Sequence, residues 1–173
     1  ELIQAMTGKL IANSSGSDFP DWTDQKNFIR IKVTSPDIPD LTIIDLPGIV
    51  RTTTDGQDES VIETVDQMLE HFLQQPRTCI LAVVAANQDL ACSEILERAK
   101  QVDPDGTRTI GVLTKPDLVD EGGERQVMQV LANVKKPLKH GYFMVKNRSQ
   151  RDINEKKSWV DAKQSEALWF KKS

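Results

Sequence analysis

The stretch that decides the fold is T-I-G-V-L-T-K-P-D, residues 109–117. It begins with a short apolar run that contains β-branched residues and is bounded by turn residues, which is typical of a buried strand in a parallel sheet. The polar turn of residues 114–117 follows directly. In open α/β sheets, ligands bind beyond the carboxyl ends of such strands. This turn is therefore the first candidate site.

Two side chains of this turn have the chemistry of a base-binding site. Lys115 can lay its alkyl stem along an aromatic ring, and Asp117 can accept two parallel hydrogen bonds from an N–H and NH₂ pair. Guanine presents such an edge. The alternative is a plain turn, because Pro and Asp are common turn formers. The turn alone does not decide between the two.

Length and composition restrict the class of protein. The chain has 173 residues, a net charge of −4 and 38% apolar residues, which suits one globular domain with a real core. The charge gives no electrostatic footprint for nucleic acid or for an anionic membrane. No segment approaches the ~20 apolar residues of a membrane span, and none resembles a signal peptide. Cys79 and Cys92 are too few for a disulfide framework and lack metal-ligand spacing. Because Cys79 lies in an apolar run, we expect it to be a buried, reduced thiol in a cytoplasmic protein.

Hydrophobic periodicity predicts alternating strands and helices. Strands are expected at residues 28–33, 41–44, 78–86, 109–114 and 142–145, the first two as an antiparallel pair. Helices are expected at residues 1–11, from Ser60 to Pro76, and at 93–102, 124–134 and 157–170. We expect Val134 to face inward and the apolar residues of 159–170 to pack in the core. This order predicts an α/β fold in three layers, a mainly parallel sheet with helices on both faces.

Two more polar loops follow predicted strands. In residues 45–48, Asp45 can hold Mg²⁺, usually through water, and Gly48 lets a backbone N–H approach a terminal phosphate. An Asx-type turn is the alternative for this loop. Asn147 and Arg148 follow the last strand and could wall the far side of a base. Because all three loops should open on the same edge, together they indicate a nucleotide site.

Three motifs and the sequence between them resemble the dynamin superfamily of large GTPases, and the antiviral Mx-like proteins are among the most similar members. The motifs are LTIIDLPG at 41–48, TRTIGVLTKPD at 107–117 and NRSQ at 147–150. The resemblance runs from the first helix nearly to the end of the chain. It implies that residues 1–173 are a partial G domain of the P-loop GTPase type. That part would reach from the second switch to the base-binding loop and the following helix, with the first strand missing.

The resemblance also implies roles for single residues on the phosphate side. Asp45 would be the magnesium-linked carboxylate, and Gly48 would act in catalysis beside the γ-phosphate and the attacking water. The chain departs from the pattern at Val50, where relatives usually have Thr. The switch after Gly48 is therefore expected to move differently.

On the base side, the resemblance implies that five residues bind guanine. Lys115 and Asp117 would grip the base, Thr114 stands where many GTPases have Asn, and Asn147 with Arg148 would complete the pocket. The implied cofactors are GTP or GDP with Mg²⁺.

The resemblance implies partners as well. In this family, GTP-bound G domains pair face to face, and Asp120 with Ser149-Gln150 would lie at that interface. The longer protein is expected in the cytoplasm, with association at membranes or the cytoskeleton through other parts and a role in membrane remodelling. Nucleic acid is not an expected partner.

The phosphate-cradling pattern Gly-x-x-x-x-Gly-Lys-Ser/Thr is absent from the sequence. Because the chain begins and ends within helical patterns, we expect it to be a fragment of a longer GTP-hydrolysing protein. We expect the fragment to have a gap in its core, to bind GTP weakly or not at all, and to be inactive. The alternative is a degenerate, non-catalytic G domain that acts as a scaffold. A small or translation-type GTPase is disfavoured by the NRSQ loop and the region of Asp89.

Overall fold

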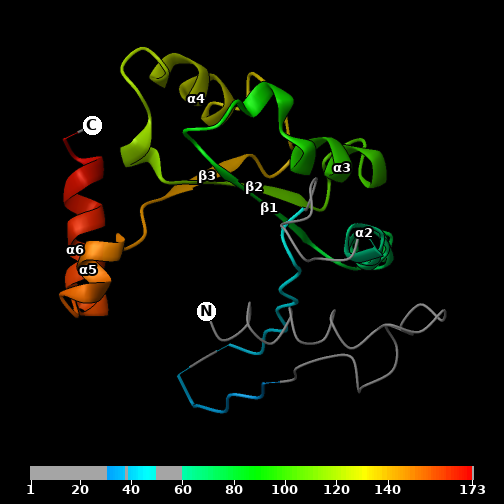
Figure 1. Cartoon of the computed structure of the whole chain (residues 1–173), viewed down its shortest axis with the longest axis horizontal. Helices are drawn as coiled ribbons and strands as arrows, with labels where there is room; N and C mark the ends of the chain where they lie inside the picture. The colour runs from blue at the N-terminus through cyan, green and yellow to red at the C-terminus, as the bar shows by residue number, and fades with distance from the viewer. Residues whose placement is uncertain (1–30, 38, 50–59, 173) are drawn as a thin grey trace. The chain divides into compact units, whose positions relative to one another are not determined.

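A computed structural model describes residues 31–37, 39–49 and 60–172 (Figure 1). The chain divides into two compact units, Glu1–Pro76 and Arg77–Ser173, and each is described by itself. The predicted helix at 1–11, the first half of the predicted strand at 28–33 and the switch position Val50 lie outside the described residues.

The second unit is built on a three-stranded parallel sheet. Its strands are β1 (Ile80–Ala85), β2 (Thr109–Thr114) and β3 (Tyr142–Val145), in the order β1-β2-β3. Crossover segments that contain helices join the consecutive strands, as parallel pairing requires. The predicted α/β fold with a parallel sheet is confirmed.

Four helices accompany this sheet: α3 (Glu94–Val102), α4 (Glu124–Leu131), α5 (Gln150–Asn154) and α6 (Trp159–Phe170). Two short 3₁₀ turns, η2 (Leu90–Cys92) and η3 (Pro116–Leu118), follow β1 and β2. Helix α3 packs on β1 and α4 on β3, and both lie on the same side of the sheet in Figure 1. The short helix α5 was not predicted, and α6 begins two residues later than the predicted helix.

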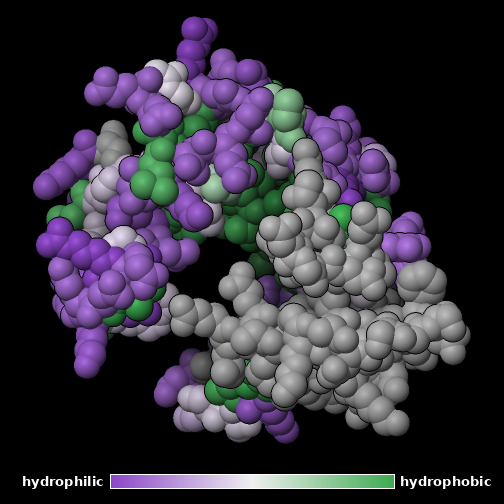
Figure 2. Space-filling model, in the orientation of Figure 1, coloured by the Kyte–Doolittle hydropathy of each residue, from purple (hydrophilic) through white to green (hydrophobic). Residues whose placement is uncertain are grey.

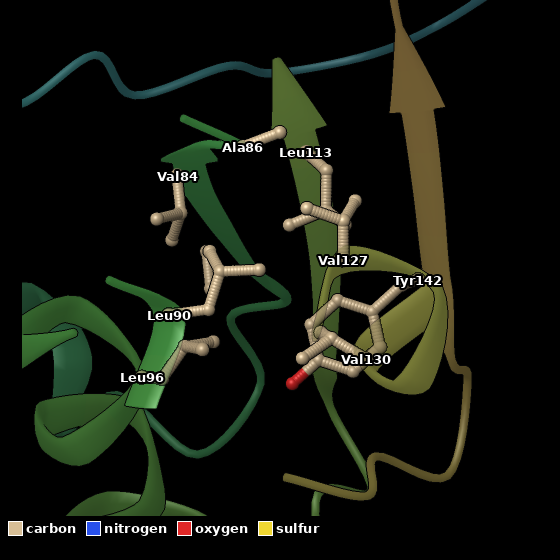
Figure 3. Close-up of a cluster of buried hydrophobic side chains, with 9 residues drawn as sticks. Val84, Ala86, Leu90, Leu96, Leu113, Val127, Val130 and Tyr142 are labelled. Atoms are coloured by element: carbon tan, nitrogen blue, oxygen red, sulfur yellow. The ribbon is translucent and has the colours of Figure 1, made fainter. Parts of the chain in front are cut away.

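The core lies between the sheet and helices α3 and α4 (Figure 3). Along β1, Ile80, Ala82 and Val84 are buried, whereas the alternating Leu81 and Val83 are exposed. This is the period of two expected for a strand covered on one face. Around β1 gather side chains from η2, α3, β2, α4 and β3, namely Leu90, Leu96, Leu113, Val127, Val130 and Tyr142.

The amino ends of β1 and β2 are tied together by Asp103, which directly follows α3. The buried carboxylate accepts hydrogen bonds from the backbone N–H groups of Thr107 (2.9 Å) and Arg108 (3.0 Å), and from the Thr109 hydroxyl (2.6 Å). The Arg108 guanidinium in turn donates to the carbonyl oxygen of Thr78 at 3.1 Å. Asp103 therefore fixes the entry of β2 beside the start of β1.

In the first unit, helix α2 (Ser60–Leu73) has Val65 and Leu69 buried, as its apolar stripe predicted. The predicted buried strand at residues 41–44 is wrong. This segment has no regular secondary structure, and Leu41 and Ile43 are 72% and 74% exposed. Residues 31–33 are not in a strand either, so the expected antiparallel pair is not formed there. An apolar run becomes a strand only where neighbouring backbone groups accept its hydrogen bonds.

Three further predictions need correction. Cys79 is exposed, because it continues the alternation of Leu81 and Val83 on the uncovered face of β1. Helix α4 ends at Leu131, and Val134 is exposed, because Asn133 turns into the left-handed region (φ 61°). The Asn133 side chain stabilises this turn by bonding both the N–H and the carbonyl oxygen of Leu138.

The apolar residues of α6 do not pack in the core either. Trp159 and Val160 are each 65% exposed, and no residue of α6 is buried. The apolar side chains are spread around the helix instead of forming one stripe, so no single packing face can cover them. Among the described residues, no helix has both the length and the apolar character needed to cross a bilayer.

Candidate functional site

The candidate site lies at the carboxyl edge of the sheet, where three parallel strands end side by side. In the sheet register, Ala85 pairs with Thr114 and Thr114 pairs with Val145. The loops after β2 and β3 therefore start at neighbouring positions. This confirms that the turn at 114–117 and the loop at 147–150 open on the same edge.

The turn after β2 has a defined backbone conformation. Lys115 adopts the left-handed region (φ 54°), which few non-glycine residues do, and Pro116 follows at the first position of η3. The N–H of Leu118 closes the turn on the carbonyl oxygen of Lys115 at 3.1 Å. Pro116 is buried while Lys115 and Asp117 are exposed. The turn thus anchors itself through proline and presents both predicted base-binding side chains to solvent.

Thr114 is held by the neighbouring strand. Its hydroxyl donates to the carbonyl oxygen of Val84 at 3.3 Å, and it accepts a backbone bond from Ala86 through its own carbonyl at 2.7 Å. These contacts align the ends of β1 and β2. They place Thr114 as a support of the turn.

The two loops of this edge meet through an ion pair that the sequence did not predict. The ammonium group of Lys146, which directly follows β3, lies 3.9 Å from Oδ2 of Asp117. The two side chains are 18% and 32% exposed. The Lys146 backbone N–H donates to Oε1 of Glu166 in α6 at 2.8 Å. In the sequence, Lys146 could be seen to precede the predicted base-binding loop of Asn147 and Arg148. Its position did not indicate that it would pair with Asp117.

Arg148 is directed toward the start of α6. Its guanidinium lies 5.2 Å from the centre of the Trp159 ring, which is a cation–π distance, and Nη1 donates to the carbonyl oxygen of Lys157 at 2.9 Å. Asn147 is exposed beside it. The arginine is thereby held in one place before any ligand is bound.

The segment after Arg148 is fixed by a capping box. The Ser149 hydroxyl accepts a bond from the backbone N–H of Asp152, and the Asp152 carboxylate accepts the Ser149 N–H at 2.9 Å. Asp152 also pairs with Lys157 at 3.0 Å. The Ser149 backbone N–H first, and then the Lys157 ammonium and the Ser149 hydroxyl, lower the pKa of Asp152. The loop of residues 147–150 thus runs directly into the capped start of α5.

The loop after β1 reaches toward α4. Asp89 accepts the backbone N–H of Ala91 at 2.9 Å and the side-chain amide of Gln126 at 3.0 Å. The bond from Ala91, followed by that from Gln126, lowers the pKa of Asp89. Asp89 therefore works as a structural cap in this part of the edge.

Asp45 and Gly48 belong to the first unit. Both are exposed, and a Cβ added at Gly48 would meet nothing within 4 Å. Gly48 thus leaves open space for a ligand to approach its backbone. In the described parts of the chain, no three His, Cys, Asp or Glu side chains are grouped to hold a metal ion.

The parallel sheet, with a polar turn and a basic loop at its carboxyl edge, defines an α/β domain of the P-loop GTPase type. The Dynamin family model matches residues 5–116, and the Dynamin central region model matches residues 126–173. The chain therefore belongs to the dynamin family.

Similar proteins in several vertebrates are interferon-induced GTP-binding proteins of the Mx type. The chain is 44% identical over 144 residues to the interferon-induced GTP-binding protein Mx of Perca fluviatilis, covering 83% of the chain and 48% of the relative. It is 47% identical over 143 residues to interferon-induced GTP-binding protein Mx1 of Mus musculus, covering 83% of the chain and 23% of the relative. For Mx2 of Homo sapiens the identity is 45% over 142 residues, covering 82% of the chain and 20% of the relative. The chain thus spans between about a fifth and a half of these proteins.

Proposed function

We propose that this chain supplies the guanine-binding edge of a dynamin-like large GTPase, and that the full-length protein hydrolyses GTP. The observation that carries the proposal is the turn at Lys115–Asp117. It presents an ammonium stem and a carboxylate to solvent at the carboxyl edge of β2, with the loop of Asn147 and Arg148 beside it. The names of the relatives, which describe them as GTP-binding proteins, support it further.

Each side chain has a distinct part in recognition. Asp117 accepts hydrogen bonds from N1–H and the 2-amino group of guanine, and Lys115 covers one face of the ring with its alkyl stem. Arg148, fixed on Trp159, and Asn147 close the other side of the base. Thr114 supports the turn through its bond to Val84. A base that lacks the N–H and NH₂ pair, such as adenine, cannot satisfy Asp117.

On the phosphate side, Asp45 and Gly48 carry the proposed roles. A single carboxylate fits Mg²⁺, because this ion is usually bound by one or two carboxylates together with nucleotide phosphates and water. Mg²⁺ would supply neutralisation of phosphate charge. The exposed Gly48 allows a backbone N–H to face the terminal phosphate. The phosphate loop that the sequence lacks would have to come from elsewhere in the full-length protein.

The wider roles of the full-length protein are proposed on family likeness. They are pairing of two G domains through Asp120 and Ser149-Gln150, a cytoplasmic location, and action at membranes or the cytoskeleton. In the chain itself, Asp120 is exposed, and Ser149 with Gln150 start the short helix α5. A GTP-dependent change from monomer to dimer in sedimentation, lost on Asp120→Lys, is the expected result.

Nucleotide binding and turnover decide the central proposal. We expect the full-length protein to bind GDP and hydrolyse GTP, and the 173-residue chain alone to bind weakly or not at all without turnover. Asp117→Ala in the full-length protein should weaken GDP binding about 100-fold, because two hydrogen bonds to an ionised acceptor are lost. Asp105→Asn, in the exposed turn before β2, is the matched control and should change nothing.

Three results would contradict these statements. Micromolar GTP binding with turnover by the 173-residue chain would overturn its proposed inactivity. Guanine nucleotide binding without turnover in the full-length protein would support the alternative function, a scaffold built on a degenerate G domain. Absence of guanine nucleotide binding would overturn the proposal as a whole.

A further inference from the structure

Helix α6 contacts the loop after β3 at two places, through Trp159 at Arg148 and through Glu166 at Lys146, and the second contact carries the inference. The N–H of Lys146 is the first backbone donor after β3, and it donates to the carboxylate of Glu166 at 2.8 Å. The two residues are twenty positions apart, and both are half-buried. A bond from an N–H to an ionised carboxylate is stronger than one to a neutral acceptor. Glu166 therefore fixes the point at which the chain leaves the sheet.

The same lysine reaches the turn after β2. Its Nζ lies 3.9 Å from Oδ2 of Asp117, and the lysine side chain is only 18% exposed. Since the backbone of Lys146 is held by Glu166 and its ammonium faces Asp117, one residue connects α6 to the proposed base-binding carboxylate. Asp117 itself lies on a turn and its side chain is only partly buried, so the nearby ammonium is a positive charge that orients it.

We propose that Glu166 is a positioning residue for guanine recognition, acting through Lys146 on Asp117. The inference rests on the proposed function, since it assigns a support to the same site. Asp117 can bond N1–H and the 2-amino group together only when its carboxylate plane is aligned with the base. A Lys146 ammonium anchored near Oδ2 limits the rotation of that plane.

Glu166 is not needed to start or hold its own helix. The hydroxyl of Ser158 caps α6 by accepting the N–H of Asp161 at 3.1 Å. The contact that Glu166 makes is directed out of α6, to the end of β3. On the face shown in Figure 2, hydrophilic residues dominate the surface of α5 and α6, and hydrophobic ones form only small patches. The hydrogen bond from Lys146, after β3, to the Glu166 carboxylate is compatible with this hydrophilic surface.

The discriminating measurement is the ratio of affinities for guanosine diphosphate and inosine diphosphate in the full-length protein. Inosine lacks the 2-amino group, so the ratio reports on the second hydrogen bond to Asp117. Glu166→Met, which removes the acceptor but keeps the length of the side chain, should lower the preference for guanine about fivefold. Glu166→Gln keeps an acceptor oxygen and should restore most of it.

Two controls separate positioning from general stability. Glu155→Met removes an exposed carboxylate near the end of α5 that pairs only along its own helix with Arg151, and it should leave the ratio unchanged. Lys146→Met should lower the ratio as Glu166→Met does, and the double variant should be no worse than either. Loss of folded protein would lower both affinities equally and leave their ratio intact.

A second readout needs no nucleotide. In the 173-residue chain, Glu166→Met should speed the hydrogen exchange of the Lys146 amide about tenfold, because its acceptor is gone. An unchanged exchange rate, or an unchanged ratio in both Glu166→Met and Lys146→Met, would overturn the inference and leave the proposed function standing. A full-length protein that binds neither diphosphate would overturn both.

Discussion

The ring of Tyr142 in β3 lies across Gly111 in β2, so closely that a Cβ on Gly111 would stand 2.0 Å from the ring carbon Cδ1. The two residues are register partners in the parallel ladder. The buried Tyr142 donates its hydroxyl to the carbonyl oxygen of Lys136 at 2.6 Å, and burial raises the pKa of Tyr142 to about 12. Because Gly111 of β2 has no side chain, the ring of Tyr142 in β3 can pack directly against its backbone.

Replacing Gly111 should destabilise the folded chain. Gly111→Ala forces the ring or the strand to move, and we expect a loss of about 2 kcal/mol or more in the free energy of unfolding. Urea denaturation followed by circular dichroism measures it. Gly48→Ala is the matched control, because its Cβ would enter open space, and the unfolding midpoint should not move. Equal midpoints for the two variants would contradict the close packing of Gly111 against Tyr142.

Asp103 should make stability depend on pH in the acid range. Burial alone would raise the pKa of Asp103, but hydrogen bonds from Thr109, Arg108 and Thr107 outweigh it and lower the pKa to about 2. Since the pKa of the folded state lies below that of the unfolded state, the stabilisation is complete above pH 3.8. It is lost as the pH falls from about 3.8 to about 2.

The loss from this group should be about 1 to 2 kcal/mol, seen as a falling urea midpoint between these pH values. Asp103→Asn should remove this part of the pH dependence and lower stability at neutral pH. Asp105→Asn, two residues away and exposed, should leave both unchanged. A pH profile of Asp103→Asn that matches the unmodified chain would refute this role.

Asp117→Asn should change the base preference of the full-length protein from guanine to xanthine. The Asn side chain offers one acceptor and one donor where the carboxylate has two acceptors, so it fits the 2-oxo group of xanthine better than the 2-amino group of guanine. We expect GDP to bind about 100-fold more weakly and xanthosine diphosphate to bind more tightly than to the unmodified protein. Competition between the two nucleotides measures this, with Asp105→Asn as the control. Weaker binding of both nucleotides would mean that Asp117 does not read the base edge.

Local patterns were sufficient to predict most of the second unit. The apolar runs gave the positions of β1 to β3, and the helical periods gave α3 and α4, because each of these segments finds its partner within the same unit. The turn at Thr114–Asp117 could be recognised as a candidate site since parallel strands carry ligand loops at their carboxyl ends. For these elements, local preference and tertiary environment agree.

Contacts between distant residues were not predictable. Lys146 meets Asp117 because β3 pairs beside β2, and Glu166 meets Lys146 because α6 returns to the edge of the sheet. No periodicity in the sequence encodes either contact. The segment at residues 41–44 was misassigned for a related reason: its strand-like composition indicates a preference, but a strand also needs backbone partners. The turn at Asn133 ended α4 early through hydrogen bonds to Leu138 that the apolar pattern does not contain.

Both cysteines should react with a thiol reagent in the native chain. Cys79 and Cys92 are exposed and not in a disulfide. We expect Ellman's reagent to titrate two thiols without denaturant, and Cys79→Ser to reduce this to one. A single reactive thiol in the native chain, rising to two in denaturant, would show that one of the cysteines is protected.

Residues 41–44 offer the sharpest contrast between the chain alone and the full-length protein. In the 173-residue chain, Ile43 is 74% exposed, so Ile43→Ala should change the free energy of unfolding by less than about 0.5 kcal/mol. Leu113→Ala is the comparison, since Leu113 is fully buried at the centre of the sheet and its truncation should cost about 2 to 5 kcal/mol. If the full-length protein supplies the strand that residues 41–44 need, the cost of Ile43→Ala there should rise to about 2 kcal/mol or more. A large cost already in the 173-residue chain would mean that residues 41–44 are packed without that strand.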